Sequence, residues 1–198
     1  MKKNLVLATT SIPRKQAFDE LDIPYEAIGS NIEEDFKGRP TKPRDLVLCL
    51  AKLKAQNVAK KRPDSLVIGF DSIGYFNGKI LEKPISKQEA FERLMAYSGN
   101  FYEFFTGIHL IERNYNESKV VVTKVKVREL DKNEIIKYLR QDGNFGRYSQ
   151  GFNPLNTFGA SFIKEIEGSY NNILRGIPLE IIVDMIKKRG FEIKNAMD

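Results

Sequence analysis

Apolar and polar positions alternate in two ways along the first half of the chain. Short apolar runs predict strands over residues 4–8, 25–28 and 65–70. Between them, segments that carry a proline in their first turn predict helices over residues 13–21 and 43–61. Such an alternation of strands and helices is typical of α/β folds.

The middle of the chain has the pattern of antiparallel hairpins. Asn77-Gly78, the strongest short-range signal for a type I′ turn, follows the strand at 65–70. Two longer apolar runs predict strands over residues 101–112 and 119–129, joined by a polar turn at 114–118. The predicted class is therefore α/β, with a mixed β-sheet that contains long antiparallel hairpins and is flanked by helices.

Capping signals mark two further helices. Ser86 with Glu89 opens one of them, and Asp131 with Glu134 opens the segment KNEIIKYLRQ. In each pair, the first side chain can accept from the backbone N–H of the second residue, while the glutamate reaches back to the start of the helix. Both pairs therefore predict a helix N-terminus.

The last third of the chain contains one long connection. Residues 142–159 are rich in Gly, Asn, Tyr and Phe, and a strand at 160–166 and a helix at 178–188 follow. A connection of this length is uncommon in a compact domain unless it has a function. We therefore expect this loop to contribute to a binding site.

Composition favours one domain over residues 1–198. The chain is 41% hydrophobic with 13 Phe and 8 Tyr, enough for a substantial core, whereas two separate cores would be cramped. Two lobes around a central cleft remain an open arrangement of that domain. The start, MKKNLVLATT, lacks a secretory pattern and no apolar run reaches membrane-spanning length, so we expect a soluble cytoplasmic protein without a membrane partner.

Cysteine and histidine chemistry is disfavoured. The single Cys49 lies in an apolar helical pattern and the single His109 in a predicted strand, where packing explains both. Zinc sites and Cys/His nucleophile systems need several such groups together. Any metal is therefore expected to be a hard ion such as Mg²⁺ or Mn²⁺. The net charge of +6 suits a polyanionic partner, either nucleic acid or a phosphorylated small molecule.

Asp71 follows the apolar run at 65–70, at the end of a predicted strand. If Asn77 and Gly78 form the turn, counting back along the hairpin places Asp71 and Lys83 at the same open end. A structural ion pair at a sheet end and a functional site both explain this placement, since exposed pairs are common and weak. Other residues must converge there to favour a site.

Further charged residues supply a set suited to phosphate chemistry. Arg14 lies at a helix start, Glu33 and Glu34 in an acidic loop, and Lys54 on the long helix. Lysine and arginine neutralise phosphates, and carboxylates hold a divalent ion or accept a proton from water. The loop before the first helix includes Ser11, a candidate N-cap, and a helix N-terminus favours anions.

Short motifs occur along the chain in a specific order and spacing. They are LATTSIPRK at 7–15, IEE at 32–34, LAKLKA at 50–55, GFDS at 69–72, EKP at 82–84, SG at 98–99, FTG at 105–107, EGSYNN at 167–172 and GIP at 176–178. Together they resemble the motifs of the Maf-like nucleoside triphosphate pyrophosphatases, a family related in fold to the inosine triphosphate pyrophosphatases. The resemblance covers nearly the whole chain.

The resemblance implies hydrolysis of a nucleoside triphosphate to a nucleoside monophosphate and pyrophosphate, with Mg²⁺ or Mn²⁺, by a homodimeric enzyme. It implies catalytic roles for Asp71, the general base, and Lys83. The substrate-binding and phosphate-binding residues that it implies are Ser11, Arg14, Lys15, Lys54, Ser72 and Gln150. The metal ligands that it implies are Glu33, Glu34 and Asp71.

The chain departs from the family pattern in three places. Pro13 replaces the first arginine of the family motif, which leaves Arg14 as the second and Lys15 as a candidate substitute. Ser72 replaces a threonine and keeps the hydroxyl, and Gln150 lies in an altered segment. Ser72 with Gln150 favours the branch acting on dTTP, UTP and modified pyrimidine nucleotides, because a neutral amide can pair with a uracil-type edge. The alternative is the 7-methyl-GTP branch or another noncanonical purine nucleotide, where a cationic base would favour a carboxylate.

Two other functions stay open. The positive charge and the aromatic residues of FYEFF and NFGRY are compatible with a nucleic-acid-binding module. The carboxylates among the basic residues disfavour that partner, and one apolar strand is the favoured explanation of FYEFFTG over a platform for base stacking. The altered SIPRK motif keeps a non-catalytic nucleotide-binding protein open as well.

Overall fold

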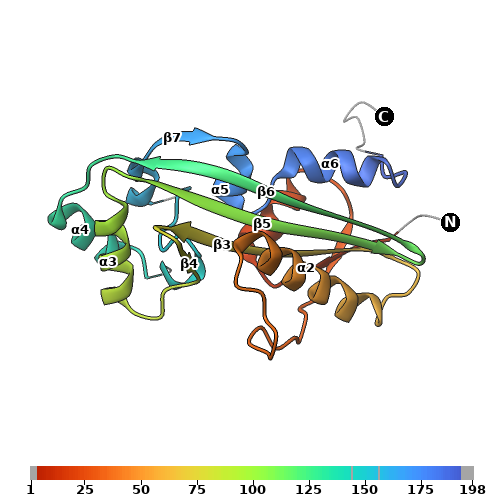
Figure 1. The fold of residues 1–198 in the computed structure, drawn as a ribbon. Coiled ribbons are helices and arrows are strands. Elements are labelled where there is room, and N and C mark those ends of the chain that lie inside the picture. Colours follow the sequence, from red (N-terminus) through yellow and green to blue (C-terminus); the bar gives the residue numbers. More distant parts are fainter. Residues whose placement is uncertain (1–3, 144, 156, 193–198) are drawn as a thin grey trace. The chain divides into compact units, whose positions relative to one another are not determined.

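The structure is a computed structural model that describes residues 4–143, 145–155 and 157–192 (Figure 1). Its elements follow one another as β1 (Leu5–Ala8), α1 (Ile12–Asp19), β2 (Tyr25–Ala27), α2 (Pro43–Ala59), β3 (Leu66–Phe76), β4 (Lys79–Leu81), α3 (Lys87–Tyr97), β5 (Phe101–Glu112), β6 (Tyr115–Val127), α4 (Lys132–Gln141), the 3-10 helices η1 (Phe145–Arg147) and η2 (Phe158–Phe162), β7 (Ile163–Glu167), α5 (Tyr170–Arg175) and α6 (Leu179–Lys187).

The strands form a seven-stranded mixed sheet. Its order is β2-β1-β3-β5-β6-β7, with β4 paired to β3. β1 runs parallel to β2 and β3, whereas β4 is antiparallel to β3 and β7 is antiparallel to β6. The predicted α/β class with a mixed sheet is therefore confirmed. No helix within the described residues is long and apolar enough to span a membrane.

The described residues group into two compact units. The first lies within Met1–Asp71, Thr106–Val120 and Arg175–Asp198, and the second within Ser72–Phe105 and Val121–Leu174. β3, β5 and β6 each contribute residues to both units, because the boundaries fall inside these strands. The single domain expected over residues 1–198 stays a prediction.

In the first unit, α2 packs closely against two strands. A Cβ on Gly69 of β3 would lie 2.2 Å from the carbonyl oxygen of Ala51, and one on Gly107 of β5 would lie 2.2 Å from that of Val47. Only residues without a side chain let the helix backbone come this near. The two glycines thus fix where α2 lies on β3 and β5 (Figure 1).

The first unit also has an apolar cluster between its strands and α2. Its buried members are Val6, Ala8, Ala55, Val58 and Val67. β1 and β3 supply the strand side and α2 the helix side, as the apolar runs predicted. Side chains removed from water on both faces stabilise this parallel part of the sheet.

The second unit has an apolar core around α3 and α4. Fourteen buried side chains form it, namely Ala90, Leu94, Tyr97, Tyr102, Phe104, Val125, Val127, Leu130, Ile135, Tyr138, Leu139, Phe152, Phe162 and Ile173. The rings of Tyr97 and Tyr102 stack with centroids 4.4 Å apart. Phe152 and Phe162 bring the chain that follows α4 into the same core.

The β3–β4 hairpin has the predicted turn. Phe76 pairs with Lys79, and Asn77 and Gly78 between them have φ values of 47° and 77°. Positive φ at both central residues is what a type I′ turn requires. The hydrogen-bonded register follows from the Asn-Gly signal alone.

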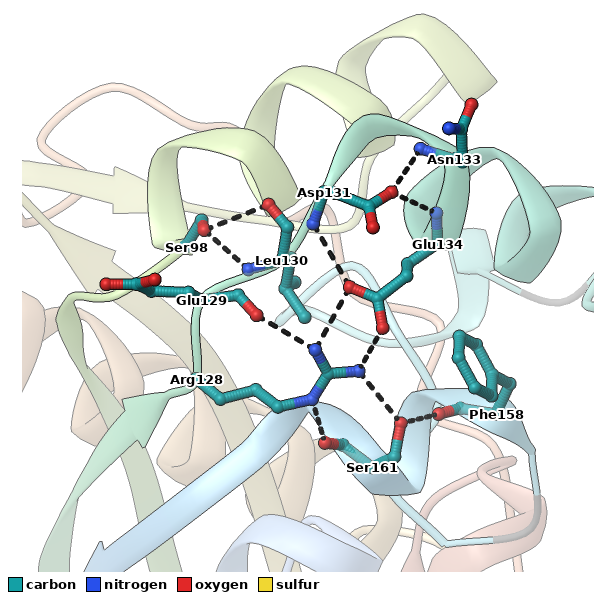
Figure 2. A network of polar contacts seen from close by, with 9 residues as sticks. All are labelled: Ser98, Arg128, Glu129, Leu130, Asp131, Asn133, Glu134, Phe158 and Ser161. Carbon is teal, nitrogen blue, oxygen red and sulfur yellow. Dashed lines mark hydrogen bonds and ion pairs between the residues drawn. The ribbon is translucent and has the colours of Figure 1, made fainter.

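The capping box predicted at α3 forms only in part, whereas the one predicted at α4 is complete. Ser86 Oγ accepts from the backbone N–H of Glu89 at 3.1 Å, but the Glu89 carboxylate accepts from the N–H of Ile85 instead of Ser86. At α4 the box is complete, since Asp131 accepts from the N–H of Glu134 at 3.0 Å and Glu134 accepts from the N–H of Asp131 at 3.1 Å (Figure 2).

Several predicted boundaries were wrong. β6 begins at Tyr115 and not at residue 119, because a tight turn at Arg113, whose φ is 50°, replaces the predicted turn at 114–118. β7 begins at Ile163, since η2 occupies the preceding residues. Helix α5 was not predicted, because the polar segment EGSYNN resembles a loop in sequence.

Candidate active site

Asp71 is a buried carboxylate inside β3. The residue is 7% exposed, and its Oδ1 accepts from Lys54 Nζ at 2.7 Å. Lys54 lies on α2 between Ala51 and Ala55, which face Gly69, so the same close packing that fixes α2 brings the ammonium to Asp71. Side chains of only one carbon at residues 51 and 55 allow this approach.

Lys54 also holds the acidic loop. Its Nζ lies 2.7 Å from Glu34 Oε1, so one ammonium bridges two carboxylates. The side chains of Lys54 and Asp71 are 14% and 9% exposed, whereas that of Glu34 is 52% exposed. Glu33 is exposed in the same loop. The cluster therefore runs from a buried carboxylate to a solvated one.

Arg14 is anchored by backbone carbonyls near this cluster. Its Nε donates to the oxygen of Gly176 at 3.1 Å and its Nη1 to that of Phe70 at 3.4 Å. The guanidinium also lies over the Phe70 ring, 5.5 Å from the centroid. Because Phe70 immediately precedes Asp71, these contacts fix the arginine beside the carboxylate.

The N-terminal loop places Ser11 at the predicted start of α1. Ser11 occupies the N-cap position of α1, but its side chain makes no capping hydrogen bond; its N–H donates to Thr9 Oγ1 at 3.1 Å. Lys15 is partly buried, and its carbonyl accepts from the hydroxyl of Tyr25 at 3.1 Å. The predicted N-cap position of Ser11 is therefore confirmed, although its side chain makes no capping hydrogen bond, and its phosphate-binding role stays a prediction.

The charges around Asp71 compete with its burial. Burial raises the pKa of the Asp71 carboxyl above its ordinary value, and the attraction of Lys54 and Arg14 only partly offsets this effect. Glu34 acts in the same direction as burial, because two like charges disfavour each other. A carboxylate with a raised pKa accepts a proton more readily than an ordinary aspartate does.

The other predicted site residues belong to the second unit. Gln150 is 2% exposed and its Nε2 donates to the carbonyl of Ile173 at 3.4 Å, while Lys83 is exposed. The carbonyl of Ser72 accepts from Ser149 Oγ at 2.9 Å. The β3–β4 ladder ends at the pair Gly74–Leu81, so the strand pairing does not continue to Lys83. The convergence of Asp71 and Lys83 stays a prediction.

Histidine and cysteine take no part in this cluster. His109 is 2% exposed on β5 and its Nδ1 lies 2.7 Å from Ser118 Oγ, while Cys49 is a partly buried free thiol on α2. Within the described ranges, no group of three or more His, Cys, Asp or Glu side chains is arranged to hold a metal ion by itself. Any metal at Asp71 would therefore need ligands from a substrate or from water.

This chain matches a known protein family over most of its length. The sequence model of the family described as Maf-like protein matches residues 4–189. The chain belongs to the Maf-like protein family. A protein of Halalkalibacterium halodurans named dTTP/UTP pyrophosphatase is 37% identical over 192 residues, which cover 97% of this chain and 99% of that protein.

A second relative carries a different name. The 7-methyl-GTP pyrophosphatase of Vibrio vulnificus is 33% identical to this Maf-like chain over 192 residues, which cover 96% of each. Among solved structures, a nucleoside-triphosphatase/dITP/XTP pyrophosphatase of Mycobacterium abscessus aligns with 94% of this chain and 97% of its own at 11% identity. Its TM-score of 0.42 is too low to support an argument.

Sequence reasoning missed two buried polar residues of this Maf-like protein. Asn172 is 0% exposed and donates from Nδ2 to Thr123 Oγ1 at 3.1 Å, although it lies in the quoted motif EGSYNN. Arg93 is 7% exposed on α3, and the spacing of buried positions along this helix could have identified it. It stands in the buried stripe formed by residues 90, 93, 94 and 97, where helical spacing calls for an apolar side chain.

Proposed function

We propose that this Maf-like protein is a nucleoside triphosphate pyrophosphatase, which releases pyrophosphate and a nucleoside monophosphate. The observation that carries the proposal is the buried Asp71 held by Lys54, in a chain that matches the family over residues 4–189. A buried carboxylate with a raised pKa is suited to accept a proton from water. The names of both relatives support the same reaction class.

The reaction uses water as the nucleophile. A water oxygen forms a bond to the α-phosphorus, the bond from the α-phosphorus to the bridging oxygen breaks, and pyrophosphate leaves with that oxygen. Asp71 accepts the proton that the water loses. Lys54 and Arg14 contribute positive charge toward the phosphates, because this chemistry depends on positioning and charge neutralisation more than on covalent help.

Three further proposed contacts come from the second unit and two from the first. Lys83 binds phosphate through its exposed ammonium, and the Ser72 hydroxyl and the Gln150 amide contact the substrate. Ser11 and Lys15 contribute at the start of α1. These roles come from the family resemblance.

The carboxylates fit a hard divalent cation. Glu34 and Asp71 approach the same Lys54 ammonium, so they are neighbours, and Glu33 adjoins Glu34. Mg²⁺ is often held by one or two carboxylates together with substrate phosphates. We infer that Asp71 together with Glu33 or Glu34 holds Mg²⁺ or Mn²⁺, with further ligands from the substrate or from water, and that the ion when bound would neutralise phosphate charge.

We favour dTTP, UTP or modified pyrimidine nucleotides as substrates. Gln150 presents a neutral amide, which can pair with a uracil-type edge. The relative named for dTTP and UTP is 37% identical and the one named for 7-methyl-GTP is 33% identical, a difference too small to decide. The alternative substrate is therefore 7-methyl-GTP or another noncanonical purine nucleotide. We further expect a cytoplasmic homodimer, which size-exclusion chromatography with light scattering would test for assembly.

The decisive assay measures pyrophosphate separately from phosphate. Purified protein is incubated with Mg²⁺ or Mn²⁺ and a panel of dTTP, UTP, CTP, methylated pyrimidine triphosphates, 7-methyl-GTP, ITP and common purine triphosphates. We expect equal amounts of pyrophosphate and monophosphate from one class of base, and loss of both with a chelator. Nucleotide binding without turnover across the panel would instead identify a non-catalytic binding protein.

A further inference from the structure

Arg93 of α3 joins two separate segments of the second unit. Its side chain is 5% exposed, and its Nη1 donates to the carbonyl oxygen of Glu82 at 2.5 Å and to that of Ser149 at 2.6 Å. Its Nη2 donates to Glu89 Oε1 at 2.7 Å, one turn earlier on the same helix. One guanidinium therefore bridges two loops that are far apart in the sequence.

Each bridged carbonyl belongs to the residue before a predicted site residue. Glu82 precedes Lys83, and Ser149 precedes Gln150. The carbonyl of one residue and the N–H of the next share a rigid peptide plane. A hydrogen bond to that carbonyl therefore also positions the backbone nitrogen of the following residue. Arg93 thus positions the backbone at Lys83, the phosphate-binding candidate, and at Gln150, the candidate for base recognition.

Glu89 holds the other side of the Lys83 segment. Its Oε2 accepts from the backbone N–H of Ile85 at 2.9 Å, while its Oε1 accepts from Arg93. Lys83 and Pro84 therefore lie between two anchored backbone groups, the Glu82 carbonyl and the Ile85 N–H. Because this short segment is anchored at both ends, the Cα of Lys83 has little freedom to move.

The Gln150 loop is packed tightly against the same arginine. Gly151 has a φ of 84°, and a Cβ there would lie 3.1 Å from Arg93 Cδ. The N–H of Gly151 donates to the carbonyl of Tyr148 at 2.9 Å, which closes a turn around Gln150. The arginine stem and its guanidinium therefore contact the two sides of Gln150.

Burying a guanidinium is costly unless its N–H groups find partners, and an apolar residue would suit this helical position better. A planar fork can serve two carbonyls and a carboxylate at once, whereas lysine is a point charge. The partners of Arg93 lie on the two segments that carry predicted site residues, which explains why an arginine stands in an apolar stripe.

We propose that Arg93 is a positioning residue of the pyrophosphatase, which sets the spacing between Lys83 and Gln150 and thereby couples base recognition to phosphate binding. This inference rests on the proposed function for its catalytic part. Its structural part, the joint fixing of residues 82–85 and 148–151, does not. The two parts are tested separately.

Hydrogen–deuterium exchange tests the structural part. In Arg93→Met, we expect faster exchange in residues 82–85 and in residues 148–151, because both carbonyls lose the same donor. Arg128→Met is the matched control, since Arg128 also donates to two backbone carbonyls and pairs with a glutamate in the same unit (Figure 2). Faster exchange in only one segment of Arg93→Met, or the same change in Arg128→Met, would overturn the joint role.

Steady-state kinetics with two nucleotides tests the catalytic part. We expect Arg93→Met to lower kcat/KM for the preferred nucleotide by about tenfold to a hundredfold, because small misplacements of binding groups have large effects on rate. The ratio of kcat/KM between preferred and disfavoured bases should shrink at least about fivefold, a change that lowered stability alone does not produce. Arg128→Met should leave that ratio unchanged.

A double variant identifies the route of the effect. If Arg93 acts through Gln150, then Arg93→Met should change base selectivity little in a Gln150→Ala background, because coupled residues are not additive. Full additivity would overturn the proposal. Should Arg93→Met not fold, Glu89→Gln takes its place with a smaller shift in the same direction, and an unchanged ratio in that variant would count against the proposal.

The outcomes separate this inference from the proposed function. If the wild-type protein releases no pyrophosphate from any nucleotide, the proposed function fails while the exchange experiment still tests the bridge. If the wild type is active and Asp71→Asn is inactive, an unchanged selectivity in Arg93→Met removes the positioning role alone.

Discussion

Asp71 in the first unit and Glu134 in the second are both carboxylates paired with a cation, but their pKa values move in opposite directions. Burial raises the pKa of Asp71 in spite of Lys54. Hydrogen bonds from Arg128, followed by that from the N–H of Asp131, lower the pKa of Glu134. Both residues are carboxylates with a cationic partner, so their burial and hydrogen bonds account for the opposite shifts in pKa.

Glu134 belongs to a network that holds structure together. Arg128 donates to both Glu134 oxygens and to the carbonyls of Glu129 and Ser161, and Glu134 closes the capping box with Asp131 (Figure 2). These bonds favour the ionised form. At Asp71 burial instead disfavours the ionised form, and strongly shifted pKa values of this kind are concentrated at functional sites.

The largest expected effect is on turnover by Asp71→Asn. Because a general base contributes about 10²- to 10⁴-fold, we expect pyrophosphate release to fall by that factor while the folded structure persists. Glu134→Gln is the matched change in the other region and should retain activity. Near-normal turnover in Asp71→Asn would remove the aspartate from the proposed mechanism.

The next largest effect concerns the partner of Asp71. In Lys54→Met, a buried carboxylate loses its ammonium, and breaking a buried pair costs about 3–5 kcal/mol. Urea unfolding should therefore give a markedly lower free energy of unfolding. The double variant Lys54→Met/Asp71→Asn should recover part of that loss, and failure to recover any would show that the lysine acts through its other contacts.

A smaller effect is expected for Arg128→Met. The change leaves the Ser161 and Glu129 carbonyls without their guanidinium donor, and we expect a loss of about 1–3 kcal/mol in unfolding free energy. Since Arg128 and Glu134 are both about one-third exposed, water replaces part of the lost bonds. Turnover of nucleotide should be unchanged, and a loss of activity beyond the unfolded fraction would contradict this division of roles.

The smallest effect is the pH dependence of stability. Glu134 has a lowered folded pKa, so its contribution is present above the ordinary glutamate pKa of about 4.3 and is lost as pH falls through the folded value. The wild type should exceed Glu134→Gln in stability near neutrality, and the difference should shrink in acid.

Asp71 should show the reverse trend in metal-free buffer. Its folded pKa is raised, so its penalty is absent below the ordinary aspartate pKa of about 3.9 and grows as pH rises through the folded value. The wild type should therefore lose stability relative to Asp71→Asn as pH rises. Urea unfolding at several pH values measures both differences in free energy of unfolding. The same pH trend for Asp71→Asn and Glu134→Gln would refute the opposite pKa shifts of the two carboxylates.

Sequence reasoning succeeded where a local signal determined the structure. The Asn77-Gly78 turn fixed the register of its hairpin, and Asp131 with Glu134 fixed the start of α4. The bounds of β5 agree with the predicted residues 101–112, since a long apolar run has few alternative structures. The ion pair from Lys54 to Asp71 joined two residues that had been selected separately.

Sequence reasoning failed where tertiary contacts decided. Ser11 occupies the predicted N-cap position, but its residue type did not reveal that its side chain would make no capping hydrogen bond. Helix α5 forms in a mostly polar segment and buries Ile173 and Leu174. Two apolar residues are too few to show a helical pattern in the sequence. The two carbonyls that accept from Arg93, at Glu82 and Ser149, lie outside its helix, so helical spacing does not predict them.

The contact of α2 with β3 has a consequence for how this protein can evolve. The distance between the Lys54 ammonium and the Asp71 carboxylate depends on Gly69, a position without a side chain. Substitutions at Glu34 can adjust the charge of the cluster one step at a time. At Gly69, even a single methyl group would push the helix away and carry the lysine with it, so this position tolerates no such stepwise change.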